Sequence, residues 1–292
     1  METLFIVLTT ECNRSCPFCF YVTGYQKKAE EKLSIDLLSD FLNYLKRVGL
    51  KQVIFSGGEP FIRKDLFAAI KSSSETGLYN LVLTNGDFLN DEVIPKLIES
   101  GVNDLSINFN SLTEQRNPGL IPFIKKLAAA KVIPITLITP VTKKNLKEIE
   151  EIYQFSKSLS IGQIFQPAFI LENNPSFEEL SLRRANEGEW SLIRKTLNKW
   201  AEDSGTEIYI KLFYDLYEGK PTKPENCYMG TNTLVLNADG NLIPCFHRKD
   251  LIIGNILEDR FDAILKNLYK FSGELPEAKC FGEHCISLFT NL

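Results

Sequence analysis

Short apolar runs alternate with segments of helical period up to about Ile170, and this alternation constrains the fold more than any other feature. Parallel strands joined by helices form right-handed βαβ units. We therefore predict an α/β protein with a parallel sheet. The expected strands are Leu4–Leu8, Gln52–Phe55, Tyr79–Leu83, Asp104–Ile107, Ile133–Ile138 and Gln163–Phe169. The expected helices are Ile35–Val48, Leu66–Thr76, Asp91–Glu99, Leu120–Ala130 and Leu146–Ser158.

Three cysteines, Cys12, Cys16 and Cys19, follow the first expected strand at C-x₃-C-x₂-C spacing. Iron–sulfur clusters usually take four thiolates, so three would leave one iron of a [4Fe–4S] cube open to another ligand. A zinc site that includes a histidine and a set of buried thiols are the alternatives. Zinc sites usually combine two C-x₂-C pairs, and structural thiols seldom gather beside polar residues such as Asn13 and Arg14. The spacing therefore favours an iron–sulfur cluster.

Glycines and polar side chains stand just after the other expected strands, where the active site of a barrel lies. Glycines permit close backbone approach, and the carboxylate of Glu59 could accept hydrogen bonds from an ammonium group. Taken singly, these residues could be ordinary turns, a helix N-cap at Asn145 and a solvated Arg116. Their joint placement at one edge of the sheet favours a common site. The residues are Gly57, Gly58 and Glu59, then Thr84, Asn85 and Gly86, then Ser106, Asn108 and Arg116, and finally Thr142 and Asn145.

The cysteine motif, with Phe18 before its last cysteine, and the sequence Gly57-Gly58-Glu59-Pro60 resemble the signatures of radical S-adenosylmethionine (SAM) enzymes. The resemblance implies a partial (β/α)₆ TIM-type barrel. It also implies a [4Fe–4S] cluster on Cys12, Cys16 and Cys19, whose open iron binds SAM. Cleavage of SAM then yields a 5′-deoxyadenosyl radical that removes a hydrogen atom from the substrate. The implied cofactor-binding residues are Phe18, Gly57, Gly58, Glu59, Thr84, Asn85, Ser106, Asn108, Arg116 and Asn145, and Arg116 is also a catalytic candidate.

The alternation stops after Lys211, and this change predicts a domain boundary. Residues 1–211 are expected to form the barrel with a packed helix at Trp190 to Trp200, residues 212–224 a linker, and residues 225–292 a small C-terminal module. Within the module, Asp239-Gly240 predicts the tip of a β-hairpin. The hairpin strands are expected at Thr233–Leu236 and Leu242–Pro244, followed by a helix at Asp259–Tyr269.

The C-terminal module carries the four remaining cysteines, Cys227, Cys245, Cys280 and Cys285. Four thiols can close a second [4Fe–4S] site; a Cys₄ zinc site is the alternative, although zinc knuckles favour tighter pairs. The segment resembles twitch, a shortened SPASM module that binds one auxiliary cluster. The two histidines stand beside these cysteines and are more simply hydrogen-bonding neighbours or exposed, with His247 a candidate general base.

Composition excludes several classes of partner. The net charge is −4, from 33 basic and 37 acidic residues, and no basic run indicates nucleic acid binding. The longest apolar stretch, Val132 to Val141, is too short to span a membrane, and the start lacks a signal peptide. A cytoplasmic location is expected, where grouped cysteines indicate metal binding or catalysis rather than disulfides.

The resemblance implies net oxidation of a small molecule or a ribosomal peptide, with the auxiliary cluster as electron acceptor and an external donor such as flavodoxin or ferredoxin. A redox-neutral peptide epimerase, which needs an unligated cysteine, and a non-catalytic Fe–S or SAM-binding protein are the alternatives. Only three residues precede the first expected strand, so we expect no fused leader-binding domain. This favours a small substrate, although a separate leader-binding protein is compatible with a peptide.

Overall fold

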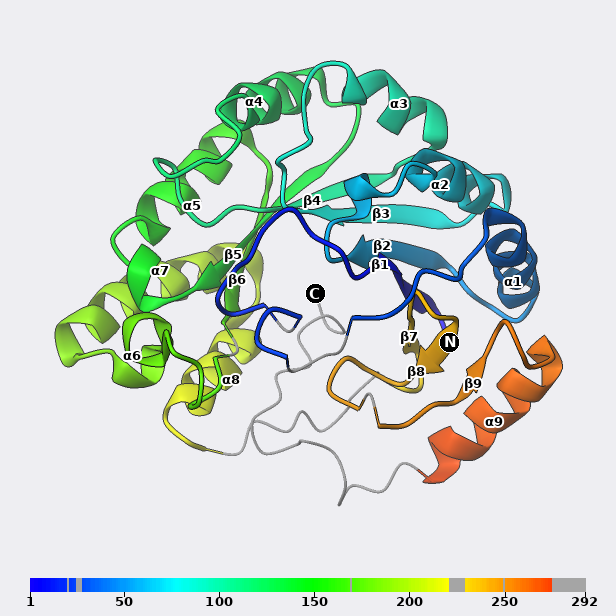
Figure 1. Cartoon of the computed structure of the whole chain (residues 1–292). Coiled ribbons are helices and arrows are strands. Elements are labelled where there is room, and N and C mark those ends of the chain that lie inside the picture. The colour runs from blue at the N-terminus through cyan, green and yellow to red at the C-terminus, as the bar shows by residue number, and fades with distance from the viewer. Residues whose placement is uncertain (20, 25–27, 169, 221–228, 249, 275–292) are drawn as a thin grey trace.

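A curved nine-stranded sheet forms the centre of the computed structural model, which describes residues 1–19, 21–24, 28–168, 170–220, 229–248 and 250–274 (Figure 1). The strand order is β6-β5-β4-β3-β2-β1-β7-β8-β9. The first six strands are parallel neighbours in chain order, so each connection is a βαβ crossover. This confirms the predicted α/β class and the partial barrel. The six strands are β1 (Thr3–Thr9), β2 (Gln52–Gly57), β3 (Tyr79–Thr84), β4 (Asp104–Asn108), β5 (Ile135–Val141) and β6 (Gly162–Pro167).

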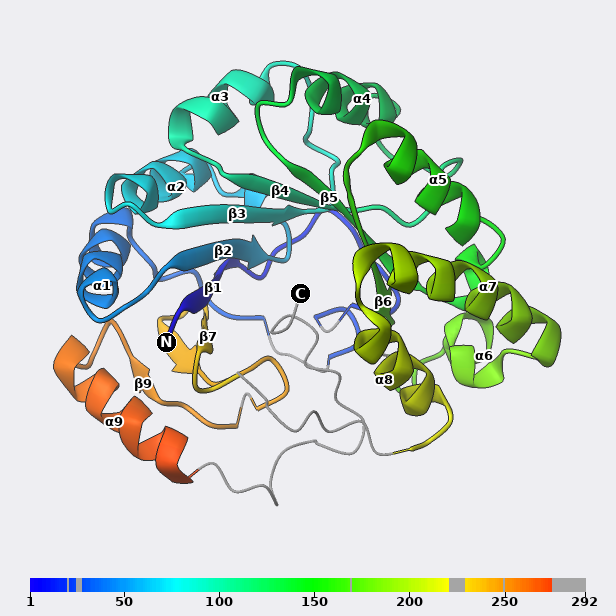
Figure 2. The same cartoon turned by 180° about the vertical axis from the view of Figure 1, so that it is seen from behind.

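Five crossover helices cover the convex face of the sheet, as both views of the cartoon show (Figures 1 and 2). In the first of them, Leu38, Phe41, Leu42 and Leu45 recur at helical spacing and are buried against the sheet. Ser34 caps that helix by accepting the N–H of Leu37 at 3.3 Å. The five helices are α1 (Ile35–Arg47), α2 (Leu66–Glu75), α3 (Val93–Ser100), α4 (Leu120–Ala130) and α5 (Ile149–Leu159).

Three further helices follow β6, and the second and third of them build a second core around Phe165, Trp200 and Phe213 on the β5–β6 side of the barrel. The expected helix at Trp190 to Trp200 is confirmed as part of a longer one. The last helix of the three was missed, because its aromatic and β-branched residues lie where the βα alternation ends. These helices are α6 (Phe177–Leu180), α7 (Glu187–Ser204) and α8 (Glu207–Tyr217).

The C-terminal strands extend the barrel sheet. Strand β7 (Thr233–Leu236) pairs in parallel with β1, from Thr3↔Thr233 to Ile6↔Leu236. Strands β8 (Asn241–Ile243) and β9 (Gly254–Asn255) follow in antiparallel order, which confirms the predicted hairpin. Helix α9 (Phe261–Glu274) begins with Phe261, whose ring packs edge-on against the ring of Phe41 in α1, with 5.0 Å between the ring centroids.

The predicted linker, 212–224, overlaps the end of α8, and its last four residues lie outside the described residues. The division into a barrel and a separate module therefore stays a prediction. In the part of the chain that the structure describes, no helix has the length and apolar character needed to cross a membrane.

The concave face of the sheet carries a small apolar cluster formed by Phe5, Val7, Ile54, Val235 and Ile243. Rings from the loop after β1 and from the segment after β8 pack against this cluster. The cluster fills part of the barrel interior. The carboxyl ends of the six parallel strands remain gathered at one edge, where a barrel places its active site.

Candidate active site

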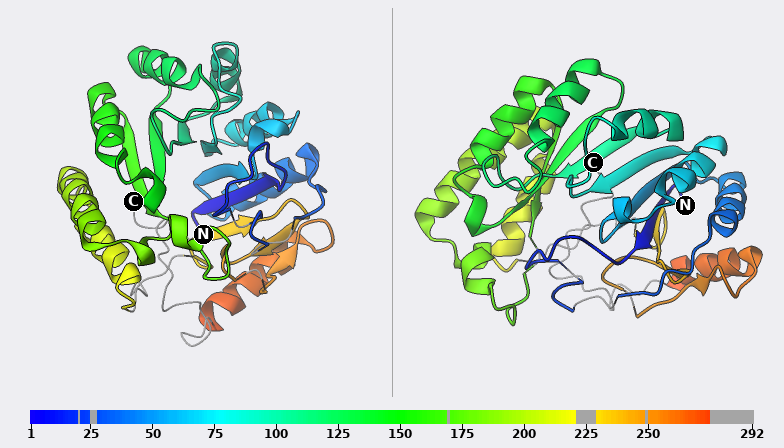
Figure 3. Two further views of the ribbon diagram at one scale, coloured as in Figure 1. Left: turned by 60° about the vertical axis from the view of Figure 1, so that its left-hand side comes forward. Right: turned by 45° about the horizontal axis from the view of Figure 1, so that its top comes forward.

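The segment after β1 carries the three-cysteine motif and crosses the mouth of the barrel, from β1 toward the β5–β6 side (Figure 3). We name residues 10–32 the cysteine loop. On the far side of the mouth, the carbonyl of Pro17 accepts a hydrogen bond from Asn174 Nδ2 at 2.6 Å. On its return, the N–H of Lys32 donates to the carbonyl of Ala238 in the hairpin turn at 2.8 Å. The cysteine loop therefore contacts the segment after β6 on one side of the barrel and the C-terminal hairpin on the other.

The three thiols of this loop are partly exposed, and in the described structure none of them forms a disulfide. The Sγ of Cys12 accepts the backbone N–H of Arg14 at 3.4 Å and lies 3.7 Å from Asn85 Nδ2. Burial raises the pKa of the Cys12 and Cys16 thiols. Among the described residues, no three His, Cys, Asp or Glu side chains gather as ligands of a single metal ion. Three thiols spread over one loop, with N–H groups beside a sulfur, fit a cluster with several irons.

Two glycines at the end of β2 allow the cysteine loop to lie against that strand. A Cβ on Gly57 would meet the carbonyl oxygen of Thr9 at 2.3 Å, and one on Gly58 would meet that of Glu11 at 2.2 Å. At this approach, Gly58 N–H donates to Thr9 at 2.7 Å, and Glu59 N–H donates to Glu11 at 2.8 Å. The glycines thus set the base of the cysteine loop, a role that the sequence indicated only as close approach to a ligand.

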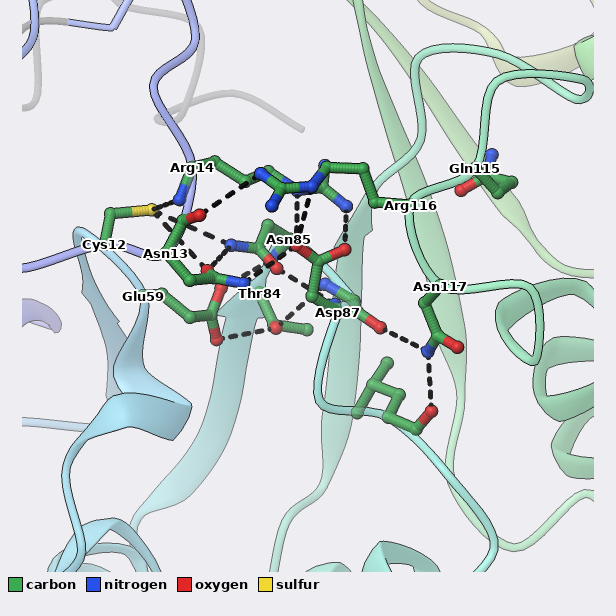
Figure 4. Close-up of polar contacts among 12 residues, drawn as sticks. Cys12, Asn13, Arg14, Glu59, Thr84, Asn85, Asp87, Gln115, Arg116 and Asn117 are labelled. Carbon is green, nitrogen blue, oxygen red and sulfur yellow. Dashed lines mark hydrogen bonds and ion pairs between the residues drawn. The ribbon is translucent and has the colours of Figure 1, made fainter.

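The carboxylate of Glu59 is fully buried and holds the ends of two loops together (Figure 4). One oxygen accepts the hydroxyl of Thr84 at 2.8 Å and the N–H of Phe61 at 3.2 Å, and the other accepts the N–H of Asn85 at 2.7 Å. Burial raises the pKa of Glu59, although these donors act to lower it. Two cavities, described below, lie at the strand ends, and in the part of the chain that the structure describes Glu59 lines neither of them.

We expect Glu59→Gln to lower the free energy of unfolding by about 2 kcal/mol, because the amide nitrogen would face donors that now bind a carboxylate. Denaturant unfolding of the metal-free chain measures this change. The matched control is Glu75→Gln on the exposed face of α2, which should leave stability unchanged.

The same variant tests the SAM contact that the family resemblance implies for Glu59. A variant that folds and binds SAM with unchanged affinity in equilibrium dialysis would exclude Glu59 as a direct ligand. Weaker binding together with normal stability would instead favour direct contact and contradict the structural role.

A polar network centred on Asp87 joins the cysteine loop to the loop after β3 (Figure 4). Asp87 Oδ2 accepts Arg14 Nε at 2.9 Å and Asn13 Nδ2 at 2.8 Å, while Oδ1 accepts a second nitrogen of Arg14. Burial acts to raise the pKa of Asp87, but the hydrogen bonds and charge of Arg14 hold it below its usual value. Sequence reasoning missed Asp87. The signal that could have predicted this ion pair was an acidic residue, Asp87, after β3 and a basic residue, Arg14, between two cysteines.

Two cavities at the strand ends are lined by all of the predicted cofactor-binding residues except Glu59. One has a volume of about 190 Å³ and the other of about 310 Å³. The smaller is lined by Gly57, Gly58, Thr84, Asn85, Ser106 and Asn108. The larger is lined by Phe18, Arg116 and Asn145, together with Cys16.

Asn145 and Arg116 differ in how much of their hydrogen-bonding capacity is used. Asn145 Oδ1 accepts the N–H of Thr142 at 2.9 Å, and its Nδ2 donates to the carbonyls of Asn110 and Pro140 at 3.2 and 2.9 Å. This side chain therefore fixes the turn after β5, but the alternative prediction of an N-cap at Asn145 is wrong, because Thr142 is the N-cap and Asn145 is the third residue of its capping box. Arg116 is mostly exposed and donates to the carbonyl of Asn13 at 3.1 Å.

Of the four predicted ligands of the auxiliary cluster, the structure describes only Cys245. Cys245 follows β8, and its carbonyl accepts the N–H of Arg248 at 3.2 Å. Burial lowers the pKa of the nearby His247. The other predicted ligands, Cys227, Cys280 and Cys285, lie outside the described residues, as does His284.

A third cavity, of about 510 Å³, lies between the cysteine loop and the C-terminal hairpin. Tyr21, Lys28 and Ala29 line it from the cysteine loop. Asn237 and Asp239 line it from the hairpin turn. The cavity therefore has one wall from each of the two cysteine-bearing parts of the chain.

Comparison with known proteins identifies several relatives. The chain is 27% identical over 296 residues to the AdoMet-dependent heme synthase of Methanosarcina barkeri, covering 90% of this chain and 82% of that protein. It is 30% identical over 171 residues to the PqqA peptide cyclase of Gluconobacter oxydans, covering 56% and 48%. The fold matches Streptococcus suis SuiB, solved with S-adenosylmethionine bound, with a TM-score of 0.66 and 15% identity over 89% of this chain and 64% of SuiB.

Two family models match this sequence. The iron–sulfur cluster-binding SPASM domain matches residues 227–285, which contain the four C-terminal cysteines. The radical SAM superfamily matches residues 6–156, just over half of the 292-residue chain. These matches confirm the predicted cofactors, namely SAM with its [4Fe–4S] cluster and an auxiliary iron–sulfur cluster. The chain belongs to the radical SAM superfamily of enzymes.

Proposed function

We propose that this enzyme carries out a net two-electron oxidation of its substrate at an unactivated C–H bond. When bound, the first [4Fe–4S] cluster and SAM would supply a 5′-deoxyadenosyl radical for hydrogen-atom abstraction. When bound, the auxiliary [4Fe–4S] cluster would accept one electron and a base of this chain would take one proton, so that the substrate would lose two hydrogen atoms in all. The cavity between the cysteine loop and the C-terminal hairpin carries the proposal, because a substrate there would contact both cluster-bearing segments.

The chain's own residues have defined tasks in this proposal. Cys12, Cys16 and Cys19 hold the first cluster, and Cys227, Cys245, Cys280 and Cys285 hold the second. The residues that line the two smaller cavities bind SAM. Arg116, exposed beside the cysteine loop, has donors available for an anionic group of SAM or substrate. His247 is the proposed proton acceptor.

The relatives support two classes of substrate. One relative is named for heme and another for a peptide. The third cavity, at about 510 Å³, has a size typical of pockets for small molecules, and it would also admit one short peptide segment. We therefore propose a small molecule or a segment of a ribosomal peptide as substrate. An external donor such as flavodoxin or ferredoxin would supply the first electron, in the cytoplasm.

Anaerobic turnover with SAM and dithionite in D₂O tests the proposed reaction. Candidate peptides and a small-metabolite extract serve as substrates, and mass spectrometry follows 5′-deoxyadenosine and product. We expect a product that lacks two hydrogen atoms relative to the substrate. A product of unchanged composition that carries solvent deuterium at the reacting carbon would indicate a peptide epimerase instead. Absence of 5′-deoxyadenosine with every substrate would favour a non-catalytic protein.

A further inference from the structure

We propose that Asp87 is a positioning residue for the cysteine loop. Its carboxylate holds Arg14 and Asn13, and through them it keeps the Cys12–Cys16 part of the loop in the conformation that receives the cluster (Figure 4). The inference rests on the proposed assignment of Cys12, Cys16 and Cys19 as ligands. It concerns this chain's own residues and the retention of the cluster, and it does not depend on the identity of the substrate.

Asp87 can position other residues because hydrogen bonds from neighbouring residues hold its own loop, the one after β3, in place. Asn117, which follows β4, donates from Nδ2 to the carbonyls of Gly86 and Leu89 at 3.0 and 2.8 Å. Gly86 has a φ of +81°, which strains other residues, and a Cβ there would make a tight contact of 3.0 Å with the Leu120 side chain. The N–H of Asp87 donates to Asn85 Oδ1 at 2.9 Å. Residues 85–89 are therefore held on both sides of the carboxylate.

The contact between Asp87 and Arg14 is a two-pronged ion pair in a largely buried place. Both carboxylate oxygens accept guanidinium nitrogens, and the exposed fractions of the two side chains are 13% for Arg14 and 10% for Asp87. Such pairs constrain direction as well as distance. Removal of one partner leaves a buried charge without compensation, which costs far more than breaking an exposed pair. Loss of the Asp87 charge should therefore push Arg14, and the loop with it, toward solvent.

The path from Asp87 to the thiols is short. Arg14 lies midway between Cys12 and Cys16 in the sequence, and its own N–H donates to Cys12 Sγ at 3.4 Å. Asn13 lies beside Cys12 and accepts Asn85 Nδ2 at 2.8 Å, while the same Nδ2 lies 3.7 Å from Cys12 Sγ. Asp87 thus fixes the side chains of both residues that immediately follow the first thiol. A displacement of this segment would move Cys12 relative to Cys16.

The test compares cluster retention in the full-length, reconstituted enzyme with and without the Asp87 charge. Under anaerobic conditions, a ferrous chelator is added, and the SAM-responsive EPR signal of the reduced cluster is followed with time alongside total iron release. We expect Asp87→Asn to lose this signal about tenfold faster than the unaltered chain. The matched control is Asp91→Asn, four residues after Asp87 in the sequence. It removes an exposed partner of Lys126 and should leave the rate of cluster loss unchanged.

Two further variants separate positioning from a purely electrostatic effect. Arg14→Gln combined with Asp87→Asn should lose the cluster no faster than Asp87→Asn alone, because both changes break the same Arg14–Asp87 ion pair. Arg14→Lys keeps the charge but loses the two-pronged geometry, so it should also speed cluster loss, and it serves if Asp87→Asn does not fold. The proposal would be overturned if Asp87→Asn lost its cluster at the same rate as the unaltered chain. If Asp87→Asn does not fold, the same result for Arg14→Lys would overturn it. A shifted reduction potential with unchanged loss would overturn it as well.

Failure of the ligand assignment would look different. If the three cysteines do not hold this cluster, the triple cysteine-to-alanine variant will keep a SAM-responsive EPR signal. If the assignment is right and only the positioning inference fails, that variant will lack the signal, while Asp87→Asn retains it as long as the unaltered chain does.

Discussion

Replacement of Cys12, Cys16 and Cys19 together by alanine is expected to lower the iron content from about eight to about four atoms per chain, because only one [4Fe–4S] cluster retains its thiolates. The same variant should produce no 5′-deoxyadenosine from SAM under anaerobic reducing conditions. Iron analysis after reconstitution and chromatographic detection of 5′-deoxyadenosine measure the two effects. This is the largest effect we expect from any change in the barrel.

The structure indicates that the triple variant will still fold, so that its inactivity can be interpreted. Among the residues that the structure describes, the main core between the sheet and its helices contains none from the cysteine loop. The loop is also held by contacts that do not use thiols, at Pro17, Lys32 and Arg14. Unfolding of the metal-free variant should therefore match that of the metal-free unaltered chain.

Glu30→Gln provides the matched control for the triple variant, since Glu30 is an exposed residue of the same loop and its partner Lys32 is also exposed. It should retain about eight irons and normal SAM cleavage. Production of 5′-deoxyadenosine by the triple variant would show that the radical forms elsewhere in the chain, and the assignment of this loop would be wrong.

The barrel strands and helices could be predicted because each follows from a local pattern. The expected first helix at Ile35–Val48 and the observed α1 differ by one residue, since the helix has both a Ser34 cap and a regular apolar stripe. Boundaries were less accurate where prolines interrupt the pattern. Strand β5 starts two residues later than expected and continues to Val141, beyond Pro140.

Contacts between distant parts of the chain could not be predicted in this way. The hairpin was predicted from Asp239-Gly240, but nothing in its sequence specifies that β7 pairs with β1, about 230 residues earlier. Sequence separation of this size leaves the partner of a strand undetermined, because any strand with an unpaired edge offers the same backbone groups.

The candidate site was predictable as a set of residues and less so in their roles. Cysteine spacing and the two glycines, both short-range features, pointed to two loops that the structure places in contact. The three donors to Glu59 come from the segment after β2, from the last residue of β3 and from the residue that follows it, and the ion pair of Arg14 with Asp87 joins residues 73 positions apart. Such contacts depend on how the strand ends are brought together at one edge of the sheet, so they require the structure.

The second large effect concerns the auxiliary cluster. If the substrate is oxidised, the electron that remains after proton loss needs an acceptor, and the proposed cluster on Cys227, Cys245, Cys280 and Cys285 supplies one within the chain. We expect Cys245→Ala to keep SAM cleavage but to stop or sharply slow product formation. Iron content should fall to about four atoms per chain. Parallel assays of 5′-deoxyadenosine and product in the same reaction measure this uncoupling.

A small module held together by metal can unfold when a ligand is lost, and this would confuse the result. Here the hairpin is paired with β1, and Leu234, Leu236 and Leu242 belong to the main core of the barrel. We therefore expect β7, β8 and the start of α9 to remain folded in Cys245→Ala. Hydrogen exchange at these strands provides the check.

Asp262→Asn on the exposed side of α9 is the matched control for Cys245→Ala and should keep both cluster content and product formation, since its partner Arg260 is also exposed. The oxidation hypothesis is refuted if Cys245→Ala forms product at the normal rate while its auxiliary cluster is absent. It is also refuted if the unaltered enzyme returns its product with solvent deuterium and no change in composition. That second result would mean that one of the four C-terminal thiols is a hydrogen donor and not a ligand.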